Sequence, residues 1–292
     1  MRLDVATVFL QWSAGGLLFL WVTTRHRVVG VGYGWLLRGT YLVLALVAFG
    51  AGIADSDDGT GAFLRDGASL AVALAAGAAL IVSVVRRRAG VSGQTATRAA
   101  RRARVAAMTG GASDAETPAT EPDADRGREF PPALDLLAPV VGFVGLVGAA
   151  AAVGGPYELS LWRLLAGALL MGAVGDAMLL GHWYLVQPGL GREPLRELVW
   201  WTIIVWPVEV LAFLWPTGMG EVLTGTVDDG WDGLLGWTWV ACAATTLGLS
   251  ILTLLALRER AYSAVMAATG LLYLAILTGF GTDLIARAVL TP

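Results

Sequence analysis

Two carboxylic acids stand inside long apolar stretches of this chain, where an ionisable side chain is costly and usually faces protein or water. Asp176 lies near the middle of Leu161–Val186, and Glu209 lies within Leu195–Trp215, just after Pro207. Proline removes a backbone donor and is expected to kink its helix beside the Glu209 carboxyl group. Because a carboxyl group at membrane depth can bind a proton or a cation, both acids are candidate ion- or proton-binding residues.

The spacing around these acids predicts which way they face. Thr202 precedes Glu209 by seven residues on the same helix face, so its hydroxyl joins the candidate ion site. Ala168 and Gly172 recur with Asp176 at every fourth position, and small residues allow close helix contact. Asp176 is therefore expected to point into a bundle. The structural alternative for both acids is a buried carboxyl group that hydrogen-bonds a neighbouring helix.

The two histidines of the chain suggest a different chemistry. His26 follows the first apolar stretch and His182 lies near the end of the fifth, at a similar expected depth. Two imidazoles from separate helices could be axial ligands of a b-type haem, and Glu197 could hydrogen-bond His182 and set its tautomer. This alternative places haem or a quinone near His182, Trp183 and Tyr184. The simpler interpretation of His26 is a solvated basic flank.

Two short acidic runs could hold a divalent cation, because clustered carboxylates suit hard metals. Both runs lack the spacing of an EF-hand loop, and solvated loops are the simpler interpretation. The candidate metal ligands are Asp55, Asp57, Asp58, Asp228, Asp229 and Asp232.

The composition indicates which class of protein carries these residues. Of 292 residues, 56% are hydrophobic and 15% are charged, far more apolar than a soluble domain. All 20 basic residues are arginine, which excludes a lysine Schiff base, and the single cysteine, Cys242, excludes an intrachain disulfide. The net charge of −3 indicates no nucleic-acid partner. No catalytic motif is present, so an enzyme is not favoured.

The apolar residues come in blocks long enough to cross a bilayer as helices. We therefore predict an all-α, polytopic integral membrane helix bundle of about eight transmembrane helices. Residues 1–87 are expected to hold three helices, 88–132 a disordered linker that is first basic and then acidic, and 133–292 five helices. The predicted spans are Val5–Thr24, Leu36–Ala54, Ala68–Val85, Leu134–Val153, Leu161–Val186, Leu195–Trp215, Leu234–Leu257 and Ala261–Leu290.

The distribution of arginine predicts the orientation of the bundle. With the N-terminus outside, the inward-facing loops carry 16 of the 20 arginines, and the outer loops are acidic. Both termini are then expected on the outer side of the cell membrane (the inner or plasma membrane), and the linker is expected in the cytoplasm. Five linker arginines could contact anionic lipid headgroups, with a solvated charge cluster as the alternative. They are Arg86, Arg87, Arg88, Arg101 and Arg102.

Some loop motifs recur between the two halves of the chain. GVGYGWLLRG follows the first span and GLGREPLREL follows the fifth, while DDG occurs at 57–59 and at 228–230. These recurrences are compatible with a parallel 4+4 repeat of the kind found in carriers. Glycine and arginine are also expected in short inner loops without any repeat.

These observations favour a carrier or channel component with protonatable intramembrane carboxylates. The alternatives are an electron-transfer subunit that binds quinone or b-type haem near the cytoplasmic side, and a non-catalytic membrane scaffold or assembly factor. Other membrane subunits could be partners of each. The sequence does not identify a substrate.

Overall fold

The computed structural model describes residues 3–26, 28–55, 59–86, 102–103, 105–106, 130–187, 189–216 and 218–291. Within these ranges, eight helices are long and apolar enough to cross a membrane, which fits a polytopic membrane protein. In chain order the elements are α1 (Val5–Thr24), α2 (Val31–Asp55), α3 (Thr60–Val85), the 3-10 helix η3 (Pro132–Leu136), α5 (Leu137–Ala152), α6 (Tyr157–Val186), α7 (Glu193–Leu214), the short α8 (Met219–Leu223), α9 (Leu234–Ala256) and α10 (Tyr262–Val289).

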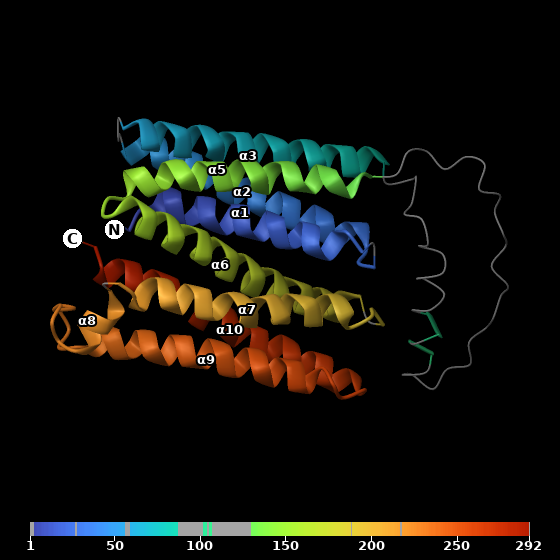
Figure 1. The fold of residues 1–292 in the computed structure, drawn as a ribbon. Coiled ribbons are helices and arrows are strands. Elements are labelled where there is room, and N and C mark those ends of the chain that lie inside the picture. Colours follow the sequence, from blue (N-terminus) through green and yellow to red (C-terminus); the bar gives the residue numbers. More distant parts are fainter. Residues whose placement is uncertain are drawn as a thin grey trace.

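The long helices lie side by side and form an elongated bundle (Figure 1). Both chain termini lie at one end, which we call the terminal end. The end of α3 and the start of η3 lie at the opposite end, which we call the linker end.

The bundle consists of two groups of four helices, one of α1, α2, α3 and α5, and the other of α6, α7, α9 and α10. In each group every helix contacts the next along the chain, and the fourth packs back against the first. The two groups meet mainly through α1 and α6, both of which start at the terminal end (Figure 1). A parallel 4+4 repeat would produce this pattern of neighbours, and the repeat itself stays a prediction.

Small residues bring α1 and α6 into backbone contact. A Cβ atom added to Gly15 would lie 1.8 Å from the carbonyl oxygen of Ala168, and one added to Gly172 would lie 2.3 Å from the carbonyl carbon of Gly15. The stripe that contains Ala168 and Gly172 thus faces the other half of the bundle. Asp176 extends the same stripe and is fully buried, as its spacing indicates.

The orientation argument counted four arginines as loop charges, although the predicted spans contain three of them, and this count was wrong. Arg38, Arg65, Arg163 and Arg287 lie inside α2, α3, α6 and α10, and each is at most 6% exposed. Helix α3 illustrates the reason. Its predicted span begins at Ala68, but the helix begins about two turns earlier, at Thr60, and these turns contain Arg65. Hydropathy ends a span at a charge, whereas the folded chain neutralises Arg65 with a contact to Asp4.

The α1–α6 contact generates a stability prediction. We expect Gly172→Ala to lower the free energy of unfolding by about 1–3 kcal/mol, because the added methyl group meets backbone that cannot move aside. Gly270→Ala is the matched control, since a Cβ atom on this α10 glycine would meet no atom within 4 Å. Thermal unfolding in detergent should show a lower Tm for Gly172→Ala and an equal or higher Tm for Gly270→Ala. Equal Tm values for the two variants would contradict the contact.

Candidate functional site

Five polar side chains from four helices meet near the terminal end, in what we call the terminal-end cluster. All five are buried, and two are arginines, two are acids and one is an amide. The members are Gln11 of α1, Arg163 of α6, Glu209 of α7, and Asp283 and Arg287 of α10.

The cluster is centred on an ion pair within α10. Arg287 donates from Nη2 to Asp283 Oδ1 at 2.9 Å, and its Nε lies 2.8 Å from Oδ2. Gly167 of α6 leaves room for this pair, because a Cβ atom there would lie 2.4 Å from Asp283 Oδ1 and 2.8 Å from Gln11 Nε2. Asp283 and Arg287 are four residues apart, a spacing that predicts a pair on one helix face, and the structure confirms the pairing. Both side chains are buried in the bundle.

Glu209 is the member of this cluster with the fewest partners. Asp283, Arg287 and Arg163 are all close enough to interact electrostatically with its carboxyl group. Neither Oε1 nor Oε2 of Glu209 accepts a well-formed hydrogen bond, and the group within hydrogen-bonding reach is the Asp283 carboxyl group. Arg163, in contrast, donates from Nε to the carbonyl oxygen of Ala212 at 2.9 Å, which ties α6 to α7.

Asp176 belongs to a second buried group, which we call the tyrosine cluster. The hydroxyl of Tyr41 donates to Asp176 Oδ1, and that of Tyr33 lies 3.4 Å from the Asp176 backbone carbonyl oxygen. The indole nitrogen of Trp12 and the hydroxyl of Tyr41 both lie within 4 Å of a Cβ atom built on Gly175. Asp176 Oδ2 and the Trp12 indole nitrogen have no hydrogen-bond partner.

The structure does not bring Asp176 and Glu209 together. Gly167, which touches the terminal-end cluster, and Asp176 are nine residues apart on α6, or about 14 Å along the helix axis. Thr202 is buried, as expected, but its hydroxyl donates to Leu198 of its own helix at 3.1 Å rather than to Glu209. The two acids therefore lie at different depths in the bundle.

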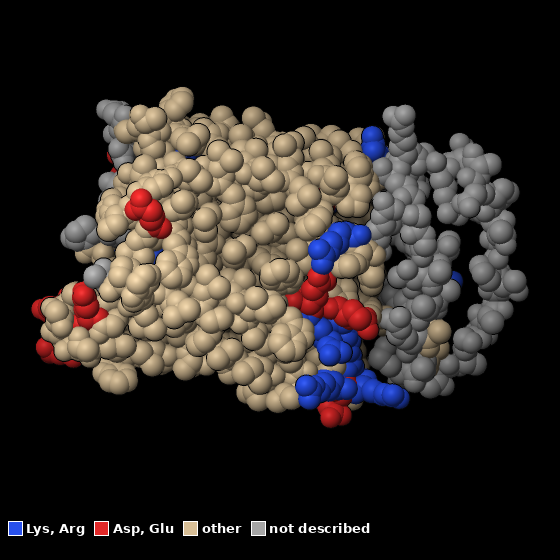
Figure 2. Space-filling view, viewed as in Figure 1, with Lys and Arg blue, Asp and Glu red and all other residues tan. Residues whose placement is uncertain are grey.

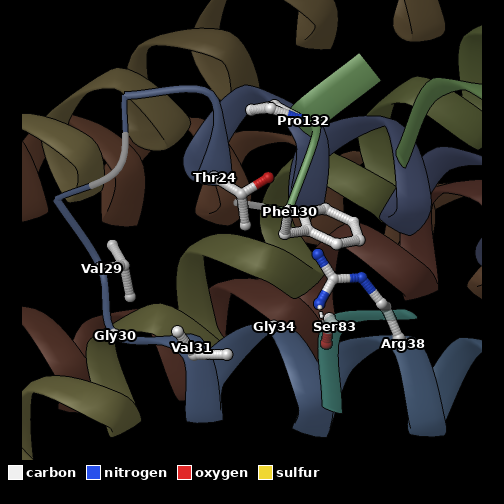
Figure 3. Close-up of a pocket in the computed structure, with 9 residues that line it drawn as sticks. All are labelled: Thr24, Val29, Gly30, Val31, Gly34, Arg38, Ser83, Phe130 and Pro132. Atoms are coloured by element: carbon white, nitrogen blue, oxygen red, sulfur yellow. Dashed lines mark hydrogen bonds between the residues drawn. The ribbon is translucent and has the colours of Figure 1, made fainter. Parts of the chain in front are cut away.

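A third polar group surrounds a small cavity at the linker end (Figure 3). Arg38 of α2 donates from Nε and Nη2 to the two carboxylate oxygens of Asp135 in η3, at 2.8 and 2.7 Å. Thr24 donates to the same carboxylate at 3.1 Å, and Ser83 accepts from Arg38 at 3.3 Å. The ring of Phe130 lies 4.5 Å from the guanidinium group. The cavity volume of about 60 Å³ suits water and is far below the roughly 300–1,000 Å³ of small-molecule sites.

The two histidines contact different helices. His182 is exposed, and its Nδ1 lies 2.9 Å from the hydroxyl of Tyr273 in α10. Glu197 contacts Arg25 and lies 3.2 Å from His26 Nε2, so the expected bond from Glu197 to His182 was wrong. No contact joins the two imidazoles among the described residues.

The residues after His182 also diverge, because successive helix positions are about 100° apart. Trp183 donates to Gln187 at 2.8 Å and lies near Tyr33 of α2. The hydroxyl of Tyr184 donates to the carbonyl oxygen of Gly191 in the following loop. These contacts spread the proposed haem or quinone residues over three directions.

In the acidic run between α8 and α9, the Asp229 carboxylate is bound by backbone amides. Asp229 accepts from the amides of Trp231, Gly233, Leu235 and Gly236 at 2.8–3.2 Å, and so caps α9. Desolvation opposes ionisation, but together these four donors lower the pKa of Asp229 below its ordinary value. Within the described ranges, no group of three or more His, Cys, Asp or Glu side chains could hold a metal ion.

Part of the sequence-based site prediction lies outside the described residues. This holds for two candidate metal ligands, Asp57 and Asp58, and for three headgroup-binding arginines, Arg87, Arg88 and Arg101. Asp55 ends α2 at the terminal end, and Asp228 accepts from the Gly230 amide at 2.8 Å. Arg86, Arg102 and Asp232 are described, and their predicted roles stay predictions.

The cap on α9 predicts a pH-dependent loss of stability in Asp229→Asn. A lowered pKa in the folded state means that the Asp229 carboxylate stabilises the fold above about pH 4, the unfolded pKa, and stops doing so as pH falls through the folded pKa. The Tm difference between wild type and Asp229→Asn should be largest at neutral pH and shrink below pH 4. Asp232→Asn is the matched control, because it removes the same charge from the same loop without removing a hydrogen bond to the α9 backbone.

The Arg38–Asp135 pair predicts strong coupling between the two positions. Arg38→Met or Asp135→Leu alone should each cost about 3–5 kcal/mol, because each leaves an unpaired buried charge. The double variant should cost much less than the sum of the two. A double-mutant cycle of unfolding free energies in detergent measures this coupling, and additive effects would show that the pair is not formed.

Comparisons with protein families, with curated proteins and with solved structures found no match to this chain. Its function therefore has to be inferred from the buried polar clusters. Sequence patterns pointed to Asp176, Glu209 and the Asp283–Arg287 pair, and missed Gln11 and Arg163. Gln11 lies within an apolar run, and that position was the available signal.

Proposed function

We propose that this protein moves protons across a membrane, with Glu209 and Asp176 as the groups that bind the proton in turn. The observation that carries this proposal is the state of Glu209. Its side chain is fully buried, it stands beside Arg163, Asp283 and Arg287, and no arginine donates a hydrogen bond to either carboxyl oxygen. Intramembrane acids of this kind are expensive and usually functional.

A purely structural role explains Glu209 poorly. A carboxyl group that only joins helices would be expected to engage donors, as Asp135 does with Arg38. Among the described residues, eleven buried side-chain atoms lack a hydrogen-bond partner. Four of them belong to the terminal-end cluster and lie outside its Asp283–Arg287 ion pair: Gln11 Oε1, both Glu209 carboxyl oxygens and Arg287 Nη1. Buried polar atoms in such numbers are normally satisfied by internal water, and water chains carry protons between carboxyl groups.

The charges of the terminal-end cluster suit a single exchangeable proton. Two arginines face two carboxyl groups, so the cluster is neutral when both acids are ionised and carries one positive charge when Glu209 is protonated. Protonation would weaken the attraction between Glu209 on α7 and Arg163 on α6. Because Coulomb attraction is strong at low dielectric, proton binding would thereby loosen the contact between the two helices.

Further buried hydroxyl groups extend the proposed route toward the linker end. Thr23 interacts with Tyr33, and Tyr33 and Tyr41 both contact Asp176. Thr24, the next residue of α1, borders the cavity beside Arg38. These groups, together with water, would connect Asp176 to the linker end, which is cytoplasmic in the orientation predicted from the arginine distribution.

Proton flux into liposomes tests the proposal. Purified protein would be reconstituted with a trapped pH-sensitive dye, and a potassium gradient with valinomycin would set the membrane potential. Wild type should acidify the lumen faster than empty liposomes. Glu209→Gln and Asp176→Asn should each reduce the rate by roughly tenfold or more, since an amide cannot take up the proton.

The matched control is Glu158→Gln, which removes an exposed acid in the first turn of α6 and should leave the rate unchanged. The Tm of each variant, measured in the same detergent, separates loss of function from loss of fold. Wild-type flux in Glu209→Gln, or no wild-type flux above empty liposomes, would overturn the proposal. A lower Tm with unchanged flux would favour the scaffold interpretation.

A further inference from the structure

A groove at the linker end lies between two loops that are distant in sequence. One loop joins α6 to α7 and the other joins α9 to α10, and the groove volume is about 720 Å³, within the range of small-molecule sites. We call it the arginine groove. Its lining includes Tyr184, Leu190, Arg196, Arg258, Arg260 and Tyr262.

Arg192 holds together the two loops that form the groove. Its guanidinium group donates to four carbonyl oxygens of the α9–α10 loop, those of Leu257, Glu259, Arg260 and Ala261. These bonds fasten the two loops to each other. The backbone that carries Arg258 and Arg260 is therefore held in place next to the first turn of α7.

Three arginines of the groove are free to bind a ligand. Arg196, Arg258 and Arg260 are exposed, and none makes a side-chain hydrogen bond or ion pair in the part of the chain that the structure describes. Glu193 lines the groove and Glu259 is adjacent, so positive charge remains in excess. Figure 2 shows basic and acidic side chains gathered near the linker end, beside the uncharged surface of the bundle.

The arginine groove continues into an apolar one. Arg196 and Glu193 also line a second groove of about 470 Å³ along α7, whose other walls include Trp200 and Ile204. Trp200 and Ile204 are 49% and 55% exposed on a helix that is apolar enough to span a membrane. A cationic surface and an apolar surface thus meet at Arg196. An amphiphile with an anionic head group would match this arrangement.

We propose that these joined grooves bind an anionic glycerophospholipid. Its phosphate would lie between Arg258, Arg260 and Arg196, since the guanidinium fork matches phosphate oxygens. One acyl chain would follow Trp200 and Ile204 along α7. Basic pockets between the ends of membrane helices bind lipid headgroups in this way. The site is separate from the five linker arginines and does not depend on proton transfer.

Native mass spectrometry of the detergent-solubilised protein tests the site. Wild type, titrated with phosphatidylglycerol or with phosphatidylcholine, should retain the anionic lipid in preference. Arg258→Gln/Arg260→Gln should reduce retention of phosphatidylglycerol by roughly 25-fold, since each arginine near a headgroup contributes about a factor of five. Trp200→Ala should weaken retention of both lipids, because it shortens the apolar wall.

Arg126→Gln/Arg128→Gln is the charge-matched control, because it removes two arginines that are neither in the loops that form the groove nor among the five candidate headgroup-binding arginines. It should retain phosphatidylglycerol as wild type does, and excess inorganic phosphate should not displace the lipid. Equal losses in the two double variants would overturn the proposal, as would equal retention of the two lipids by wild type. Full displacement by inorganic phosphate would mean that the groove binds the free anion instead. Size-exclusion profiles confirm that each variant is folded.

Discussion

The rest of the structure depends on the need to neutralise four arginines inside apolar helices. Hydrocarbon offers no hydrogen-bond partner, so each guanidinium group must find its acceptors within the protein. Three of the four find them on another element, and this ties together parts of the bundle that hydrophobic contact alone would not hold in register. These contacts are Arg38 with Asp135, Arg65 with Asp4, and Arg163 with the Ala212 carbonyl oxygen.

Helix α6 contacts the buried ion pair of α10 and also packs against α1 of the other helix group. Its glycines serve different neighbours at successive depths. Gly167 makes room for the ion pair of α10, Gly172 admits the backbone of α1, and Gly175 faces Trp12 and Tyr41 beside Asp176. A larger side chain at any of these positions would meet a group that is already committed elsewhere. The long helix α6, whose central part is mostly buried, thus contacts both polar clusters.

Local pattern was enough to predict the helices, and it failed where a partner comes from far away in the chain. The limits of α1 are as expected, because Asp4 caps it and the apolar run stops at Arg25. Asp283 and Arg287 could be paired from their spacing of four residues, but their burial depends on Gln11 and Arg163, which no local rule connects to them. Glu197 was assigned to the wrong histidine for the same reason. The membrane orientation and the roles of the acids stay predictions.

The separation of the two acids bears on which ion could use them. A metal or alkali cation needs several oxygen ligands around one point, and Asp176 and Glu209 lie at depths about 14 Å apart or more, by the rise of α6. Between the two depths Trp12 packs edge-on against Phe280, with ring centroids 4.7 Å apart. A dehydrated cation would have no ligand while passing this aromatic contact. A proton needs only one acceptor at a time and can cross on transient water, so two single carboxyl groups at different depths suit proton transfer better than cation binding.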